Sequence, residues 1–193
     1  MDEADVFSYL PENVPIFREV GSDRAHYTEF DELLLSRWDG AMAKGVFRYG
    51  LADMSTRTIP GTFGFVAQRN PKRFTHRRRP MDIQSLQQPF DPLLFNFNKI
   101  SDTEVLFRIR RGTSDLSDEH LVIVNVSPIE YGHVLLVPAP GRCSPQVITM
   151  ESLTLCLEVM SLSGLSSLYM VANSLTCICI CQPSSLSFYA SQL

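Results

Sequence analysis

The sequence lacks the short motifs that mark the commonest phosphate-binding and hydrolytic sites. It contains no glycine-rich loop of the G-x-G-x-x-G or G-x-x-x-x-G-K type, which binds nucleotide phosphates through backbone N–H groups. It also has no H-E-x-x-H zinc motif and no G-x-S-x-G nucleophile elbow. These absences exclude dinucleotide-binding, P-loop, zinc-peptidase and serine-hydrolase designs as first hypotheses.

A charge excess of one sign is also missing. The 17 Lys and Arg residues stand against 21 Asp and Glu residues, which gives a net charge of −4. A dedicated nucleic-acid binder usually carries a basic excess to neutralise phosphates, so we expect no nucleic-acid partner. The local exception is a basic run at 68–80, with Arg69, Lys72, Arg73, His76, Arg77, Arg78 and Arg79. It is either a phosphate-contacting or nuclear-localising patch or a solvated surface loop, and we favour the loop.

Targeting and membrane-spanning segments are not visible. The chain begins Met-Asp-Glu-Ala-Asp, without the basic and apolar regions of a secretory signal. No run of 18 apolar residues occurs, so we expect no membrane association. The five cysteines are odd in number and lack a secretory context, which favours reduced thiols in a cytoplasmic protein.

A metal-binding pattern is absent as well. Cys177, Cys179 and Cys181 alternate in a tail that is free of charge. Zinc sites usually separate their cysteines by two to four residues and add a second pair elsewhere. Cys143 and Cys156 do not form such a pair, so we expect neither a metal nor a cofactor.

What is present suits one globular domain, because 193 residues that are 45% hydrophobic can bury a core without disulfides. Helical spacing of apolar residues predicts helices over 28–45, capped by Thr28, and over 149–164. Runs of β-branched and aromatic residues predict strands at 46–51, 62–67, 104–109, 121–126, 133–137 and 168–171. The strands at 121–126 and 133–137 should pair antiparallel, because their connection is too short for a crossover helix. The expected fold class is α+β, after a loose N-terminal arm at 1–27.

The four histidines are the first place to look for chemistry. His26, His76 and His120 fall in the arm or in loops, whereas His133 opens a core strand after a glycine. A lone histidine in that position is more often a hydrogen-bonded structural residue than a catalyst, and we favour the structural role. The residues alone therefore indicate an α+β domain with a small-molecule site beside the strand pair.

The string from Asn125 to Pro138, Asn-Val-Ser-Pro-Ile-Glu-Tyr-Gly-His-Val-Leu-Leu-Val-Pro, resembles the histidine-triad superfamily. Within it, the closer similarity is to the GDP-hexose phosphorylases and to their animal GDP-D-glucose branch. That similarity is carried by Phe-Asp-Pro at 90–92, Phe-Asn-Phe-Asn-Lys-Ile at 95–100, Glu-Val-Leu-Phe-Arg at 104–108 and Gly-Thr-Phe-Gly-Phe-Val-Ala-Gln at 61–68. The resemblance implies an antiparallel sheet with flanking helices.

The resemblance also implies guanylyl transfer from a GDP-hexose to phosphate. In that family a histidine attacks the α-phosphate and releases hexose 1-phosphate, and inorganic phosphate then releases GDP. Covalent catalysis of this kind splits one difficult displacement into two easier steps. The implied partners are a GDP-hexose and phosphate.

Three residues match nucleotide-binding positions of the family. By the resemblance, Asn125 would face the ribose, His133 would lie near the phosphates, and Asn173 would precede the catalytic strand. For Asn125 a strand-capping amide is an equal alternative, and for Asn173 a turn residue is the alternative. Lys99 and Arg108 could contribute phosphate-binding charge, although solvated surface roles are favoured for both.

The expected nucleophile is missing. The family follows Asn-Ser-Leu with a His-x-His strand, whereas no histidine occurs here after His133. We therefore expect a partial family domain at 28–175 and a divergent tail at 176–193, incomplete at the C-terminus and without phosphorolysis. The alternative is a truncated, non-catalytic chain that at most binds guanine nucleotide or a partner chain. The Thr176–Cys181 segment alternates like a strand and could cover the open sheet edge.

Overall fold

The computed structural model describes residues 6–15, 27–62, 64–76, 85, 88–112, 119–145, 147–164, 169–172 and 178–181. It contains three α-helices: α1 (Glu29–Ala43), α2 (Pro71–His76) and α3 (Met150–Leu162). It contains eight strands: β1 (Val6–Tyr9), β2 (Ser55–Thr58), β3 (Val66–Arg69), β4 (Val105–Arg111), β5 (His120–Val124), β6 (Val134–Val137), β7 (Tyr169–Ala172) and β8 (Ile178–Cys181). Short 3-10 helices are η2 (Pro11–Asn13), η3 (Leu51–Asp53), η4 (Phe97–Lys99), η5 (Asp102–Glu104) and η7 (Pro140–Arg142).

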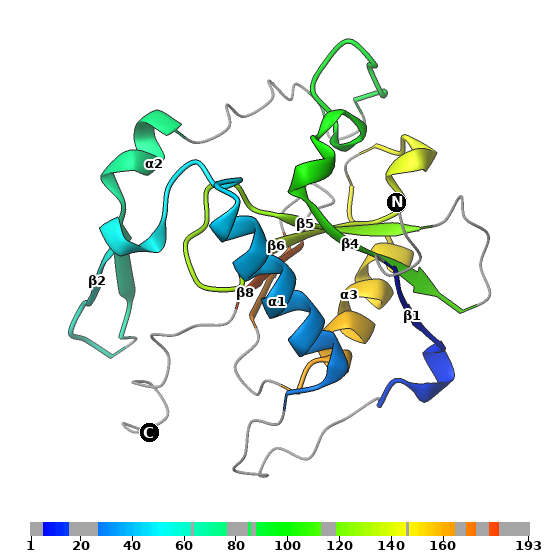
Figure 1. Cartoon of the computed structure of the whole chain (residues 1–193), viewed down its shortest axis with the longest axis horizontal. Coiled ribbons are helices and arrows are strands. Elements are labelled where there is room, and N and C mark those ends of the chain that lie inside the picture. The colour runs from blue at the N-terminus through cyan, green and yellow to red at the C-terminus, as the bar shows by residue number, and fades with distance from the viewer. Residues whose placement is uncertain are drawn as a thin grey trace.

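Six strands form the central sheet, in the order β1-β4-β5-β6-β8-β7. All neighbours in it are antiparallel except β1 and β4, which run parallel. The remaining two strands, β2 and β3, form a separate antiparallel hairpin (Figure 1). The α+β prediction and the antiparallel pairing of the strands at 121–126 and 133–137 are confirmed.

The sheet is covered on both faces. Helices α1 and α3 pack on one face, where Phe30, Trp38 and Val159 meet Val122 and Val134 in the main core (Figure 1). The segment before β4 covers the other face and packs on a smaller cluster around Ile123. Every residue of β5 is buried, as expected for a continuous β-branched run.

The two long helices are joined at their ends by polar contacts. Thr28 and Asp31 form the expected capping box of α1, and Gly45 ends that helix in the left-handed region with φ of 71°. The buried Asp31 carboxylate also accepts hydrogen bonds from Ser163 Oγ at 2.5 Å and from the Gly164 N–H at 2.7 Å. The start of α1 is thereby fixed to the residues that follow α3.

Part of the segment that was expected to form a loose arm lies in the sheet. β1 pairs with β4 from Val6 opposite Arg108 to Tyr9 opposite Arg111. Tyr9 also donates a 2.6 Å hydrogen bond to Glu158 on α3, which Arg111 binds through two further contacts of 2.6 and 2.7 Å. The arm prediction is wrong at 6–9 because these pairings come from residues a hundred positions away.

Three local predictions around the hairpin are corrected. Residues 47–49 form bends and η3 follows at Leu51, so the strand expected at 46–51 is wrong. Arg48 N–H does reach the Val126 carbonyl at 2.9 Å, but no ladder extends from it. The loop expected at 68–80 contains the end of β3 and the helix α2, whose Pro71 suits a first helical position. The strand expected at 62–67 begins later, at Val66, as β3.

The alternating tail segment contains a strand, as predicted. β8 lies between β6 and β7, with Ile180 opposite Val134 on one side and opposite Met170 on the other. The predicted strand at 168–171 is β7, shifted by one residue. Within the described residues no helix is long and apolar enough to cross a bilayer.

Candidate functional site

The turn between β5 and β6 brings two of the three expected site residues together. The side-chain amide of Asn125 lies 3.0 Å from Nε2 of His133, and the Asn125 N–H donates to the His133 carbonyl at 3.4 Å. Asn125 Oδ1 accepts from the Ser127 N–H at 3.0 Å, and His133 Nδ1 accepts from the Ile129 N–H at 3.1 Å. These bonds cross the base of the turn and fix its shape. The turn of residues 125–133, where the family resemblance leads us to expect nucleotide-binding residues, is hereafter called the nucleotide turn.

His133 is a buried, neutral residue in this turn. It is 2% exposed, and burial, with a smaller contribution from the Arg73 charge, lowers its pKa to about 4. Both of its ring nitrogens face partners inside the turn, and Trp38 Nε1 donates to its carbonyl at 3.4 Å. The ring is therefore placed to hold the turn together, as the structural interpretation of this histidine predicted. It offers no positive charge to a phosphate at neutral pH.

The other histidines take different places. His120 is buried in β5, where its Nδ1 accepts from the Ala139 N–H at 3.1 Å. His76 is exposed at the end of α2, with Nδ1 close to Thr75 Oγ1. His26 and Asn173 lie outside the described residues.

The basic run, expected as a solvated loop, docks on the nucleotide turn through α2. Arg73 Nη1 donates to the Ser127 carbonyl at 2.7 Å and to Tyr49 Oη at 3.2 Å. Arg48 Nη1 donates to the His76 carbonyl at 3.0 Å. Gln68 Nε2 on β3 donates to Glu130 Oε1 on the turn.

Figure 1 shows the resulting arrangement, with α2 and the β2–β3 hairpin on one side of the sheet. Sequence reasoning missed Asn70, Arg73 and Ser127 as a group because α2 was not expected. The only local signal was the Asn-Pro dipeptide at 70–71, which marks a turn.

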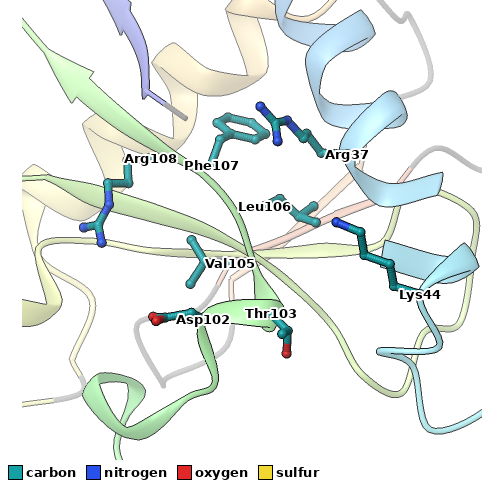
Figure 2. Close-up of a pocket in the computed structure, with 8 residues that line it drawn as sticks. All are labelled: Arg37, Lys44, Asp102, Thr103, Val105, Leu106, Phe107 and Arg108. Atoms are coloured by element: carbon teal, nitrogen blue, oxygen red, sulfur yellow. The ribbon is translucent and has the colours of Figure 1, made fainter. Parts of the chain in front are cut away.

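A separate cavity of about 220 Å³ lies between α1 and β4 (Figure 2). Arg37 reaches toward it from α1 and Lys44 from the end of that helix, while Arg108 extends on the other side of β4. Arg108 Nη1 lies 3.2 Å from the Glu119 carboxylate, which also binds Arg110 at 2.8 Å. Glu119 thus shares its negative charge between two arginines.

The described lining of the cavity includes neither Asn125 nor His133. Lys99, the other cation considered for phosphate binding, is exposed in η4. The cavity and the nucleotide turn are therefore two distinct places in the fold.

The described residues of the nucleotide turn offer hydrogen-bonding groups but little for covalent chemistry. The Asn125 amide is partly exposed, the Arg73 guanidinium approaches the turn from α2, and the one imidazole of the turn is buried. No group of three or more His, Cys, Asp or Glu side chains that could hold a metal ion occurs among the described residues. The arrangement suits recognition of an oxygen-rich anionic ligand.

Comparison with known proteins gives a consistent family. A model described as "GDPGP1-like, N-terminal domain" matches residues 29–188, a range that continues past Leu175. GDP-D-glucose phosphorylase 1 of Bos taurus is 46% identical over 153 residues, which are 77% of this chain and 40% of the relative. The Homo sapiens protein of the same name is 46% identical over 146 residues, 73% of this chain and 38% of the relative. GDP-L-galactose phosphorylase 2 of Arabidopsis thaliana is 37% identical over 149 residues, 68% of this chain and 34% of the relative.

No solved structure matches the chain. The chain spans about 40% of the length of the animal relatives named above. The matched family model nevertheless covers well over half of this chain and includes α1, the central strands and the nucleotide turn. The chain therefore belongs to the family of GDPGP1-like N-terminal domains.

Proposed function

We propose that this chain binds a GDP-hexose at the nucleotide turn and does not catalyse its phosphorolysis. The observation that carries the binding proposal is the Asn125–His133 contact at the base of the turn, in a chain whose relatives are named GDP-D-glucose and GDP-L-galactose phosphorylases. A prearranged turn of this kind binds its ligand without the entropy cost of ordering a loop.

Within this proposal the site residues have different roles. Asn125 is partly exposed and contacts the ribose, as the family resemblance implies. His133 positions Asn125 and does not touch the ligand, because its ring is enclosed in the turn. Asn173 is proposed as a further contact to the phosphates on the resemblance alone.

The proposed lack of turnover rests on the histidine inventory. A guanylyl-histidine intermediate needs an accessible ring nitrogen beside the α-phosphate. No histidine occurs after position 133, where the resemblance places the nucleophile, and the rings of His120 and His133 are buried. The chain is proposed to bind the substrate class of its family while it lacks the group that would attack it.

Two measurements on the purified 193-residue chain test this proposal. Isothermal titration with GDP-glucose should give saturable binding, and Asn125→Ala should weaken it about tenfold, while the exposed control Asn13→Ala should not change it. Incubation of the same chain with GDP-glucose and phosphate should release no hexose 1-phosphate above the blank. Turnover well above the blank would refute the inactive assignment. Equal affinities of the Asn125→Ala and Asn13→Ala variants would refute the assigned contact.

A further inference from the structure

Two buried polar atoms at the junction of α2 and the nucleotide turn have no hydrogen-bond partner. They are Nδ2 of Asn70 and Oγ of Ser127, each in a residue that is 5% exposed. They are the two unpartnered buried side-chain atoms found in the described part of the chain. Buried polar groups are nearly always paired in native proteins, so two exceptions in one place need an explanation.

Arg73 links these two residues. Its N–H donates to the Asn70 carbonyl at 3.2 Å, and its Nη1 donates to the Ser127 carbonyl at 2.7 Å. Its guanidinium has five donors, of which these structural bonds use only Nη1. Among the described residues no carboxylate forms an ion pair with it, and the nearby Glu130 is bonded to Gln68.

The three groups share one chemical requirement. The Asn70 Nδ2 atom and the guanidinium can only donate hydrogen bonds, and the Ser127 hydroxyl can donate one. Asn70 Oδ1 is already used by the Lys72 N–H at 3.0 Å, which fixes Nδ2 as the unused side of the amide. A ligand that satisfies all three must therefore present several acceptor oxygens and negative charge, as a phosphoryl group does.

We propose that Asn70, Arg73 and Ser127 form a binding site for a phosphoryl group. The assignment of this phosphoryl group to a nucleotide rests on the proposed function above, because the site would then hold a phosphate of the GDP-hexose bound at the adjacent turn. Since neither unpartnered atom contacts solvent in the ligand-free chain, the ligand enters as the six-residue helix α2 moves outward from the turn. The phosphoryl oxygens then accept hydrogen bonds from Asn70 Nδ2 and Ser127 Oγ, which burial separates from water.

The test uses the full chain with three probes in isothermal titration: inorganic phosphate, GDP and guanosine. The variant Asn70→Asp keeps the acceptor for the Lys72 N–H and replaces the unused donor by a negative oxygen. It should weaken GDP and phosphate binding at least tenfold and leave guanosine unchanged. Ser127→Ala should weaken GDP binding severalfold while its melting temperature stays equal or rises, because the variant removes an unpaired buried hydroxyl. Ser161→Ala, which alters a half-buried serine of α3, is the matched control.

Each outcome decides between the two proposals. Binding of phosphate but not of GDP by the wild-type chain, with loss in Asn70→Asp, would support the phosphoryl site and refute the proposed function. Unchanged GDP affinity in both Asn70→Asp and Ser127→Ala would refute the phosphoryl site and leave the proposed function standing. No binding of phosphate or GDP to the wild-type chain would refute both.

Discussion

At the scale of single residues, His133 illustrates what a sequence string can and cannot show. The Gly-His pair at 132–133 is visible in the sequence, and a structural role was the favoured interpretation. Its two ring contacts depend on the path of the turn, which places the Ile129 N–H and the Asn125 amide on opposite sides of the ring. The clustering of Asn70, Arg73 and Ser127 was not predictable, because no sequence spacing relates α2 to a turn about fifty residues later.

The buried His133 ring makes stability depend on pH. Its pKa in the folded chain is about 4, against an ordinary value of 6.5, so the unfolded chain binds the proton more tightly. The free energy of unfolding is therefore highest above about pH 6.5. It decreases by roughly 3 kcal/mol as the pH falls toward 4. Urea unfolding from pH 7 to pH 4.5 should show this fall in the wild-type chain, and His133→Gln should flatten it. A curve for His133→Gln parallel to that of the exposed control His76→Gln would contradict the assignment.

At the scale of elements, the sequence predicted those whose signals are local. Thr28 and Thr149 cap the two long helices as expected of Thr, and the β-branched run at 121–126 forms the fully buried β5. Elements held by distant partners were missed, because their own residues carry weak patterns. β1 is fixed through β4 and Glu158, and α2 is fixed through the Arg73 contact with Ser127.

The ion pair that fixes β1 and β4 to α3 should contribute measurably to stability. Glu158 is only 13% exposed, and its bonds to Arg111 and Tyr9 lower its pKa. Glu158→Gln removes the carboxylate that binds the Arg111 guanidinium, which is 39% exposed, so we expect a loss of about 1–3 kcal/mol in the free energy of unfolding.

Glu151→Gln is the matched control on the same helix. Glu151 pairs with Arg142 at 2.8 Å but is 60% exposed, so its loss should cost less than about 0.5 kcal/mol. Guanidinium chloride unfolding of the two variants measures both values. Equal losses in the free energy of unfolding would show that the contacts of Glu158 with Tyr9 and Arg111 stabilise the fold no more than a surface ion pair does.

At the scale of the whole molecule, β8 connects β7 to the other four strands of the sheet. The α+β class and the pairing of β5 with β6 were predictable, because both follow from strand patterns and short connections. The order of the strands in the sheet was not predictable. β8 comes from the end of the described chain, yet it lies between β6 and β7. The alternating pattern of Thr176–Cys181 did predict a strand that could cover the open sheet edge, and β8 pairs there with β6.

A proline in β8 should therefore affect two strands at once. Ile180→Pro removes a backbone donor from a strand that is paired on both sides, which a central strand does not tolerate. Hydrogen exchange should show lost protection at 169–172 and 178–181, with β4 and β5 still protected. Thr56→Pro in the exposed hairpin is the control and should leave 169–172 unchanged. Persistent protection at 169–172 in Ile180→Pro would contradict this dependence.

The place of β8 also sets an order of events during synthesis. β7 leaves the ribosome before β8, yet among the described strands β8 is the neighbour that connects β7 to the rest of the sheet. Helix α1 and strands β4, β5 and β6 can assemble earlier, because all of them precede residue 138. Until residues 178–181 emerge, β6 presents an open edge to other nascent chains, and this interval is when the protein is most exposed to mispairing.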